Sequence, residues 1–133
     1  MKNLFRKNIE FETKKTDIKN ITGMIEEIVE ESGVKNGLCH VYFTGTTGGI
    51  VINENDTMLK MDIKSFFEIV EENKNYYHNN NAHSHLRAML GSTEKAIPVV
   101  EGRLALGQWQ NILFCEFDIR PRTRKIIVTV FGE

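Results

Sequence analysis

The order of apolar and polar residues along the chain predicts a set of strands spread over most of its length. Residues 8–13 (NIEFET) alternate between polar and apolar positions, which is typical of a half-buried strand. The segments 38–44 and 49–54 are rich in strand-forming residues and are joined by the glycine- and threonine-rich stretch TGTTGG. Four more strand-like segments follow in the second half, at 97–100, 104–107, 109–118 and 125–132.

Two longer segments have helical periodicity instead. Between Asn20 and Gly33, apolar residues recur at helical spacing, with Asn20 or Asp17 available as N-cap and Gly33 as the end; these residues are Ile21, Met24, Ile25, Ile28 and Val29. A second helix is predicted from Asp56 or Thr57 to about Asn73, and its apolar face consists of Leu59, Ile63, Phe66, Phe67 and Val70.

The order of these elements predicts the fold class. Strands and helices do not alternate regularly, and the last strands are joined by short turns, with DIRPRT (118–123) typical of a β-hairpin loop. We therefore expect one α+β domain over residues 1–133, with a mixed, largely antiparallel sheet packed against two main helices. A short third helix is expected to begin after the histidine segment 81–85.

Composition narrows the choice of function. The chain has 133 residues, 26% of them charged, and a net charge of −1, which argues against general nucleic-acid binding. No apolar stretch is long enough to cross a membrane, and the first residues lack the pattern of a signal peptide. Cys39 and Cys115 lie in apolar runs far apart and are expected to be free, buried thiols. We therefore expect a cytoplasmic protein.

The segment NAHSHLRAMLG (81–91) holds the most suggestive pair of side chains. On extended backbone, His83 and His85 would point to the same side and could bind one ion, whereas on a helix they would point about 200° apart. Metal binding therefore requires that the helix begin after His85. Imidazole suits zinc and related ions. The alternative is that both histidines are solvated or cap the helix.

Two carboxylates are candidate partners of these histidines. Glu54 ends one predicted strand, and Glu116 lies inside another whose two faces are both apolar. A buried carboxylate needs a cation or hydrogen-bond donors. Glu116 is therefore expected either to form a structural ion pair, with Arg122 or Arg124, or to have a functional role.

Other residues suggest a site for an anion. In TGTTGG, small residues and the hydroxyls of Thr46 and Thr47 resemble an anion cradle, although a tight turn explains the same sequence. Arg87 follows the histidines and could supply positive charge to a phosphate. Gln110 flanks the single tryptophan and can contact a polar ligand.

Three blocks together resemble a known family: SGVKNGLCHVYFTGTTGGIVINEN, AHSHLRAMLGST and GRLALGQWQNILFCEFDIRPRTRKIIVTVFGE. They are similar to the YjbQ-like family, which is associated with a secondary thiamine-phosphate synthase activity. The resemblance implies a compact α+β fold, a homotrimer and pockets near subunit boundaries. It also implies a set of site residues, which are Thr46, Thr47, Asn53, Glu54, His83, His85, Gln110 and Glu116.

The function implied by the resemblance is the joining of a pyrimidine methyl diphosphate to a thiazole phosphate with release of pyrophosphate. Thr46, Thr47, Arg87 and a divalent metal, zinc or magnesium, would stabilise the leaving group. One departure is Gly45, where the family usually has histidine; another is Gln108, where many members have threonine. Two alternatives stay open. The first is a metal-dependent hydrolase of a small phosphorylated metabolite, in which His83, His85 and a carboxylate would hold zinc. The second, which Gly45 favours, is a non-catalytic trimer that binds small molecules or anions.

Overall fold

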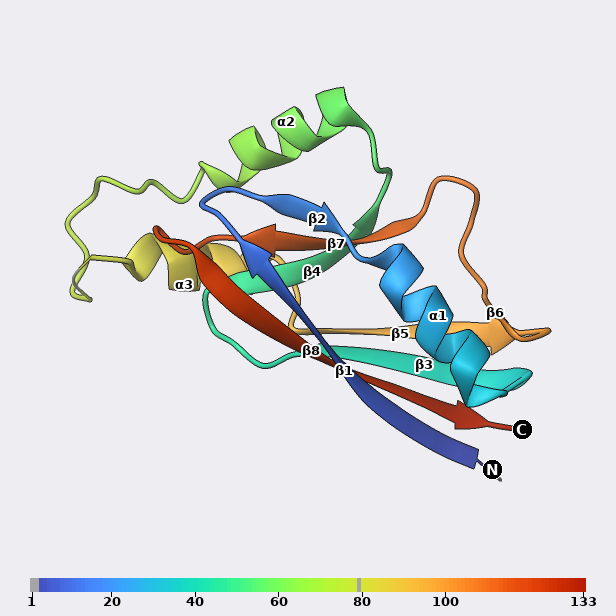
Figure 1. Cartoon of the computed structure of the whole chain (residues 1–133). Coiled ribbons are helices and arrows are strands. Elements are labelled where there is room, and N and C mark those ends of the chain that lie inside the picture. Colours follow the sequence, from blue (N-terminus) through green and yellow to red (C-terminus); the bar gives the residue numbers. More distant parts are fainter. Residues whose placement is uncertain (1–2, 79) are drawn as a thin grey trace.

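The strands form two antiparallel sheets in a computed structural model that describes residues 3–78 and 80–133. The large sheet has the order β1-β8-β3-β5-β6, and the small sheet has the order β2-β7-β4 (Figure 1). The strands of the large sheet are β1 (Asn3–Thr13), β3 (Asn36–Phe43), β5 (Glu94–Val100), β6 (Arg103–Leu104) and β8 (Arg122–Gly132). The small sheet consists of β2 (Ile18–Asn20), β4 (Gly48–Asn53) and β7 (Asn111–Glu116). The predicted α+β class is confirmed.

Helix α1 (Thr22–Ser32) begins and ends close to the predicted positions. Gly33 takes the left-handed conformation at φ 72°, which glycine adopts without a steric penalty, and this ends the helix. The expected cap is only partly present. Asn20 Oδ1 accepts hydrogen bonds from the backbone N–H of Thr22 and from its hydroxyl, although Ile21 occupies the N-cap position.

Helix α2 (Thr57–Phe67) begins as predicted and ends earlier. Asp56 caps it, because its carboxylate accepts the backbone N–H of Leu59 at 2.8 Å. Of the five apolar residues assigned to its inner face, only Phe67 is buried, while Phe66 is 56% exposed. The helix covers less of the core than its periodicity predicts.

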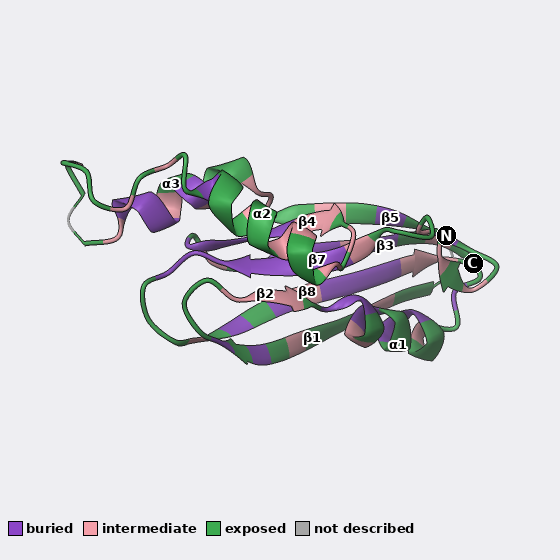
Figure 2. Cartoon of the chain, turned by 90° about the horizontal axis from the view of Figure 1, so that it is seen from above, coloured by how far each residue is buried: buried purple, intermediate pink, exposed green. Residues whose placement is uncertain are grey.

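The core lies between the two sheets. Helix α1 and one face of the small sheet pack on the same face of the large sheet, around the edge-to-face rings of Phe11, Phe43 and Phe114. The other face of the small sheet contacts α2 through Cys115, Phe117 and Phe67. Buried residues in Figure 2 are accordingly concentrated on the inner strands. The alternation expected for β7 is confirmed, since it supplies side chains to both clusters.

The segment 118–123 does not close a hairpin, which corrects the prediction. β7 pairs with β2 and β4, whereas β8 pairs with β1 and β3 in the other sheet. The segment therefore carries the chain from one sheet to the other. The reason is that both faces of β7 are apolar, so this strand belongs in the small sheet, between the core and α2. Cys39 and Cys115 are free and buried, as expected.

Among the described residues, no helix is long and apolar enough to span a membrane.

Candidate functional site

The two histidines of the NAHSHLRAMLG segment both lie on helix α3 (Ala82–Leu90), which contradicts the expectation of extended backbone. Residues two apart on a helix point about 200° away from each other. His83 is buried, with 1% of its surface exposed, whereas His85 is half-buried and lies beside His78. The geometry for shared binding of one ion by His83 and His85 is therefore absent. The helix begins at Ala82 because Asn81 O accepts the N–H groups of residues 84 and 85.

His83 lies beside a carboxylate from the segment after α2. Its Nε2 is 3.9 Å from Glu72 Oε1, and its Nδ1 is buried without a hydrogen-bond partner in the described part of the chain. Burial lowers the pKa of His83, and nearby Arg87 and Lys15 lower it further, while Glu72 acts in the opposite direction. The imidazole is therefore kept neutral at pH 7.

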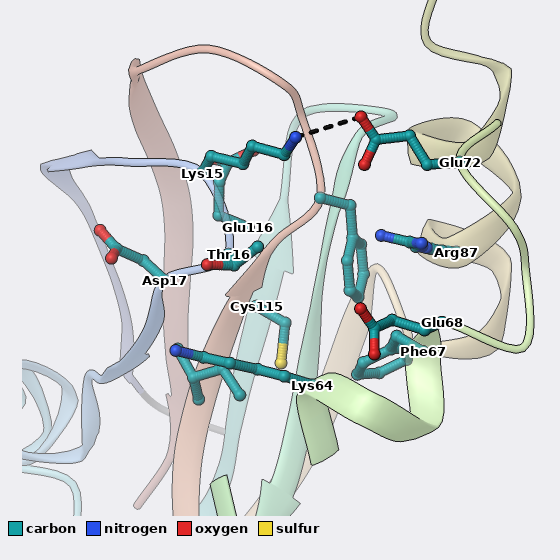
Figure 3. Close-up of a pocket in the computed structure, with 12 residues that line it drawn as sticks. Lys15, Thr16, Asp17, Lys64, Phe67, Glu68, Glu72, Arg87, Cys115 and Glu116 are labelled. Carbon is teal, nitrogen blue, oxygen red and sulfur yellow. Dashed lines mark hydrogen bonds and ion pairs between the residues drawn. The ribbon is translucent and has the colours of Figure 1, made fainter. Parts of the chain in front are cut away.

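Arg87 lies one turn after His83 on the same face of α3 and points into a cavity of about 240 Å³ (Figure 3). Its side chain is 9% exposed, and its Nε donates to the carbonyl of Val70 at 3.0 Å. No described residue accepts a hydrogen bond from its two terminal nitrogens. A nearly buried guanidinium with unused donors is the kind of group that binds a carboxylate or phosphate in a bidentate manner.

The cavity contains further charged groups from three parts of the chain. Lys15, on the turn between β1 and β2, forms an ion pair with Glu72 at 3.1 Å (Figure 3). The hydrogen bond from Lys15 is the main reason that the pKa of Glu72 is lowered. Lys64 and Glu68 line the cavity from the α2 side. The apolar part of the wall includes Cys115, whose pKa burial raises to about 12, so it remains a thiol.

Glu116 also lines this cavity, but its carboxylate is engaged by other protein groups. Arg124 donates to it from Nε at 2.7 Å and from one terminal nitrogen, and the N–H of Asp118 donates at 2.8 Å. Thr13 donates its hydroxyl to the same carboxylate. The structural ion pair, one of the two sequence-based interpretations, is thus present, and its partner is Arg124 rather than Arg122.

Arg122 instead pairs with Asp118, which the sequence analysis did not single out as a site residue. Burial raises the pKa of Asp118, but hydrogen bonds from the backbone of Ile119, from Asn81 and from Arg122 outweigh burial and lower it. Because Asn81 immediately precedes α3, this carboxylate ties the 118–122 loop to the beginning of that helix. An acidic residue two positions after a strand with two apolar faces was a sequence signal for this network.

The Thr46–Thr47 turn does not form an open anion cradle. Thr47 is buried, and Arg124 donates to both its hydroxyl and its carbonyl at 2.8 and 3.1 Å. Thr46 is exposed and does not line the Arg87 cavity. At Gly45, an added Cβ would come within 2.5 Å of Cζ of Phe43. The histidine usual in the family would therefore require the Phe43 ring to move.

Asn53, Glu54 and Gln110 lie at the opposite end of the small sheet. Gly48 is paired with Glu116 and Asn53 with Asn111, so the two ends of β4 are about 17 Å apart at the usual rise per residue. Gln110 Oε1 accepts the N–H of Gly107, and Asn53 Oδ1 accepts the N–H of Glu54. Within one chain, these three residues are separated from Arg87 and His83.

The cavity residues Lys15, Lys64 and Glu72 were missed by the sequence analysis. Lys15 and Glu72 lie among other charged residues in polar segments, and Lys64 is a polar residue of the second predicted helix. For all three, a solvated surface is the ordinary interpretation. Only the packing of α2 and α3 against the small sheet brings them together. Among the described residues, no group of three or more His, Cys, Asp or Glu side chains could hold a metal ion.

The chain is similar to proteins of one family over almost its whole length. The family model described as UPF0047 protein YjbQ-like matches residues 7–133. A UPF0047 protein of Methanothermobacter thermautotrophicus is 41% identical over 125 residues, which cover 91% of this chain and 87% of that protein. A UPF0047 protein of Archaeoglobus fulgidus is 44% identical over 119 residues, with 86% and 91% covered.

Solved structures agree with this assignment. A YbjQ-like protein of unknown function from Sulfolobus solfataricus superposes with a TM-score of 0.89 at 34% identity, covering 98% of this chain and 99% of that one. A yjbq/upf0047 family protein from Clostridium acetobutylicum gives a TM-score of 0.85 at 36% identity, with 92% and 99% covered. This chain therefore belongs to the YjbQ-like UPF0047 family.

Proposed function

We propose that the protein binds the diphosphate of a small phosphorylated substrate in the Arg87 cavity and transfers the attached group, as in thiamine-phosphate synthesis. The observation that carries this proposal is the guanidinium of Arg87, which is nearly buried, faces the cavity and has both terminal nitrogens unused among the described residues. Lys15 and Lys64 line the same space, where Lys15 forms an ion pair with Glu72 and Glu68 lies nearby on the cavity wall.

This arrangement suits a reaction with an anionic leaving group. When a pyrimidine methyl diphosphate loses pyrophosphate, negative charge accumulates on the departing oxygens, and fixed cationic donors stabilise that charge. Arg87 is held in place by the hydrogen bond from its Nε to the carbonyl of Val70, so its side chain needs little reorganisation when the anion binds. The thiazole phosphate is the second substrate in this proposal, and its attack on the methylene carbon completes the transfer.

A divalent cation that binds together with the diphosphate is part of this proposal. Magnesium is usually held by one or two carboxylates together with substrate phosphates, and Glu68 and Glu72 line the cavity. A magnesium ion bound there would neutralise charge on the diphosphate. Since His83 and His85 point apart, we assign this role to the carboxylates rather than to the two histidines.

His83 is a buried neighbour of the cavity in this proposal. It is neutral, buried and 3.9 Å from the carboxylate of Glu72, so it borders this cavity-lining group without adding charge. That Thr46, Thr47, Glu116 and His85 are site residues, as the resemblance implies, stays a prediction.

Asn53, Glu54 and Gln110 could join the site only from another copy of the chain. The resemblance implies a homotrimer, and we retain that assembly as part of the proposal because one chain keeps these residues about 17 Å from the far end of β4. Light scattering coupled to size exclusion measures the mass directly. A monomer at micromolar concentration would contradict this part.

The reaction is tested by supplying the pyrimidine methyl diphosphate and the thiazole phosphate with magnesium and measuring thiamine phosphate. Wild type should form the product, and Arg87→Gln should lose most of the activity while remaining folded. Arg103→Gln is the matched control, because Arg103 is an exposed arginine on β6, away from the cavity. No product from the wild type would contradict the transfer.

The same samples separate the two alternatives. Release of inorganic phosphate without thiamine phosphate would favour hydrolysis of a phosphorylated metabolite. Saturable binding of pyrophosphate without turnover of any substrate would favour a non-catalytic anion-binding protein. In both cases Arg87→Gln should abolish the signal if the cavity is the binding site.

A further inference from the structure

His85 has a histidine neighbour other than the one the sequence suggested. Its ring lies beside that of His78, from the segment between α2 and α3, with the ring centroids 5.0 Å apart and the ring planes at 88°. Neither imidazole takes part in a hydrogen bond or ion pair with another described residue. His78 is exposed and His85 is half-buried, so both rings are accessible from the solvent.

The separation of these rings matches that of two imidazoles on one metal ion. With metal–nitrogen bonds of about 2 Å and a tetrahedral angle, the centroids of two ligating imidazoles lie about 5 Å apart. The rings border an open cavity of about 310 Å³, whose other residues are Tyr76, Tyr77, Ala82 and Leu86. The hydroxyl of Tyr76 donates to the carbonyl of Glu71 and is therefore already used.

We propose that His78 and His85 together bind one divalent transition-metal ion of the zinc type. Imidazole nitrogens are preferred ligands of such ions, whereas magnesium and calcium prefer oxygen. Two protein ligands leave coordination positions open towards the cavity, where water or an anionic small molecule completes the shell. The site is distinct from the Arg87 cavity and does not depend on the function proposed for it, because His85 and Arg87 are two residues apart on α3 and line different cavities.

The test is a titration of the full-length protein with zinc at pH 7.5, followed by calorimetry and by the histidine ring signals in NMR spectra. Wild type should bind one ion per chain, with shifts of the His78 and His85 signals. His78→Ala and His85→Ala should each weaken binding at least about tenfold, since even loss of a group that only orients a ligand costs 10–100-fold. His40→Gln is the control, because His40 pairs with Glu94 on the large sheet.

Cobalt provides a second readout, since its visible spectrum distinguishes nitrogen from thiolate ligands. A spectrum without thiolate charge-transfer bands supports the histidine pair over Cys39 and Cys115. The proposal is overturned if the wild type shows no saturable binding, if both alanine variants bind as the wild type does, or if the cobalt spectrum shows thiolate ligands. Circular dichroism of each variant confirms that it is folded.

Discussion

Two clusters of charged residues lie near each other at one end of the small sheet and differ in how completely their hydrogen bonds are used. In the first, the carboxylate of Glu116 and the guanidinium of Arg124 are almost fully buried and bind each other and Thr47. In the second, Arg87 uses one nitrogen on a backbone carbonyl and leaves its terminal nitrogens to a cavity. The first cluster holds the sheets together, and the second has donors available for a ligand.

The difference shows why burial alone does not identify a functional residue. A buried charge is costly unless it is paired, so a fully paired charge is explained by the fold that it stabilises. A charge that is nearly buried and only partly paired has no such explanation within the chain. Substitutions that separate stability from ligand binding therefore test the comparison, and the following are ordered from the largest expected effect to the smallest.

The largest expected effect is the loss of stability when the buried ion pair between Glu116 and Arg124 is broken. Arg124→Leu should lower the free energy of unfolding by about 3–5 kcal/mol, because it leaves the carboxylate of Glu116 buried without its cation. Urea denaturation followed by circular dichroism measures this loss. The double variant Glu116→Met/Arg124→Leu removes both charges and should recover a large part of the stability. A loss below about 1 kcal/mol in Arg124→Leu would contradict the structural role of the pair.

Removal of the Thr47 hydroxyl should have a smaller effect of the same kind. Thr47→Val deletes an acceptor for Arg124 and should cost about 1.5–3 kcal/mol, the range for hydrogen bonds to charged groups. Because Thr47 lies outside the Arg87 cavity, pyrophosphate affinity should stay within twofold of wild type. Isothermal calorimetry checks the second point, and a selective loss of affinity would restore Thr47 as a binding residue.

The buried histidine predicts a dependence of stability on pH. The folded pKa of His83 lies below its ordinary value of 6.5, so the unfolded chain takes up the proton first as pH falls. The stabilisation that neutral His83 contributes is complete above pH 6.5. It is lost progressively as the pH falls from 6.5 to the pKa of His83 in the folded state. Between pH 7.5 and 5.5 the melting temperature of the wild type should therefore fall more than that of His83→Gln.

A control for this experiment is Arg103→Gln, which changes an exposed side chain on β6 and removes no histidine. It should keep the full pH dependence of the wild type. An equal change of melting temperature with pH in the wild type and His83→Gln would mean that His83 is protonated equally in the folded and unfolded states. Glu72 and Asp118 have lowered pKa values, so their contribution is lost only at more acidic pH.

The smallest effect is expected at the rim of the cavity. Lys64 is exposed and contributes charge through solvent, so Lys64→Gln should weaken pyrophosphate binding only about two- to threefold, equivalent to less than 1 kcal/mol. This difference should shrink as salt is raised, because exposed charges are screened. A salt-independent loss of tenfold or more would place Lys64 in direct contact with the anion.

Sequence patterns were sufficient for the parts of the fold that depend on local periodicity. Both faces of the strand that holds Glu116 were predicted to be apolar, and Phe114 and Cys115 of β7 do pack in two different clusters. The cap residues Gly33 and Asp56 marked helix ends correctly. The beginning of α3 was predicted wrongly, because it was placed after His85 so that the two histidines could bind one metal ion. Its true beginning at Ala82 follows from contacts of Asn81 with helix N–H groups and with Asp118.

The candidate site was less predictable, since it depends on contacts between distant segments. Arg87 and Glu116 were identified, and an ion pair of Glu116 with Arg122 or Arg124 was one of two interpretations. No local pattern selected Arg124 as the partner or indicated that Arg87 is open to a cavity. Lys15 and Glu72 are 57 positions apart and meet only after α2 and α3 pack on the small sheet. The pairing of His78 with His85 depends in the same way on the path of the chain before α3.

The most direct test of the difference between the two clusters is calorimetric titration of pyrophosphate, with magnesium present, into wild type, Arg87→Gln and Arg103→Gln. We predict saturable binding to the wild type and the Arg103 control, and a loss of at least about tenfold, or 1.4 kcal/mol, in Arg87→Gln. Thermal unfolding should show that Arg87→Gln remains folded. Equal affinity of all three proteins for pyrophosphate, or no binding to the wild type, would contradict the assignment of the Arg87 cavity as a ligand site.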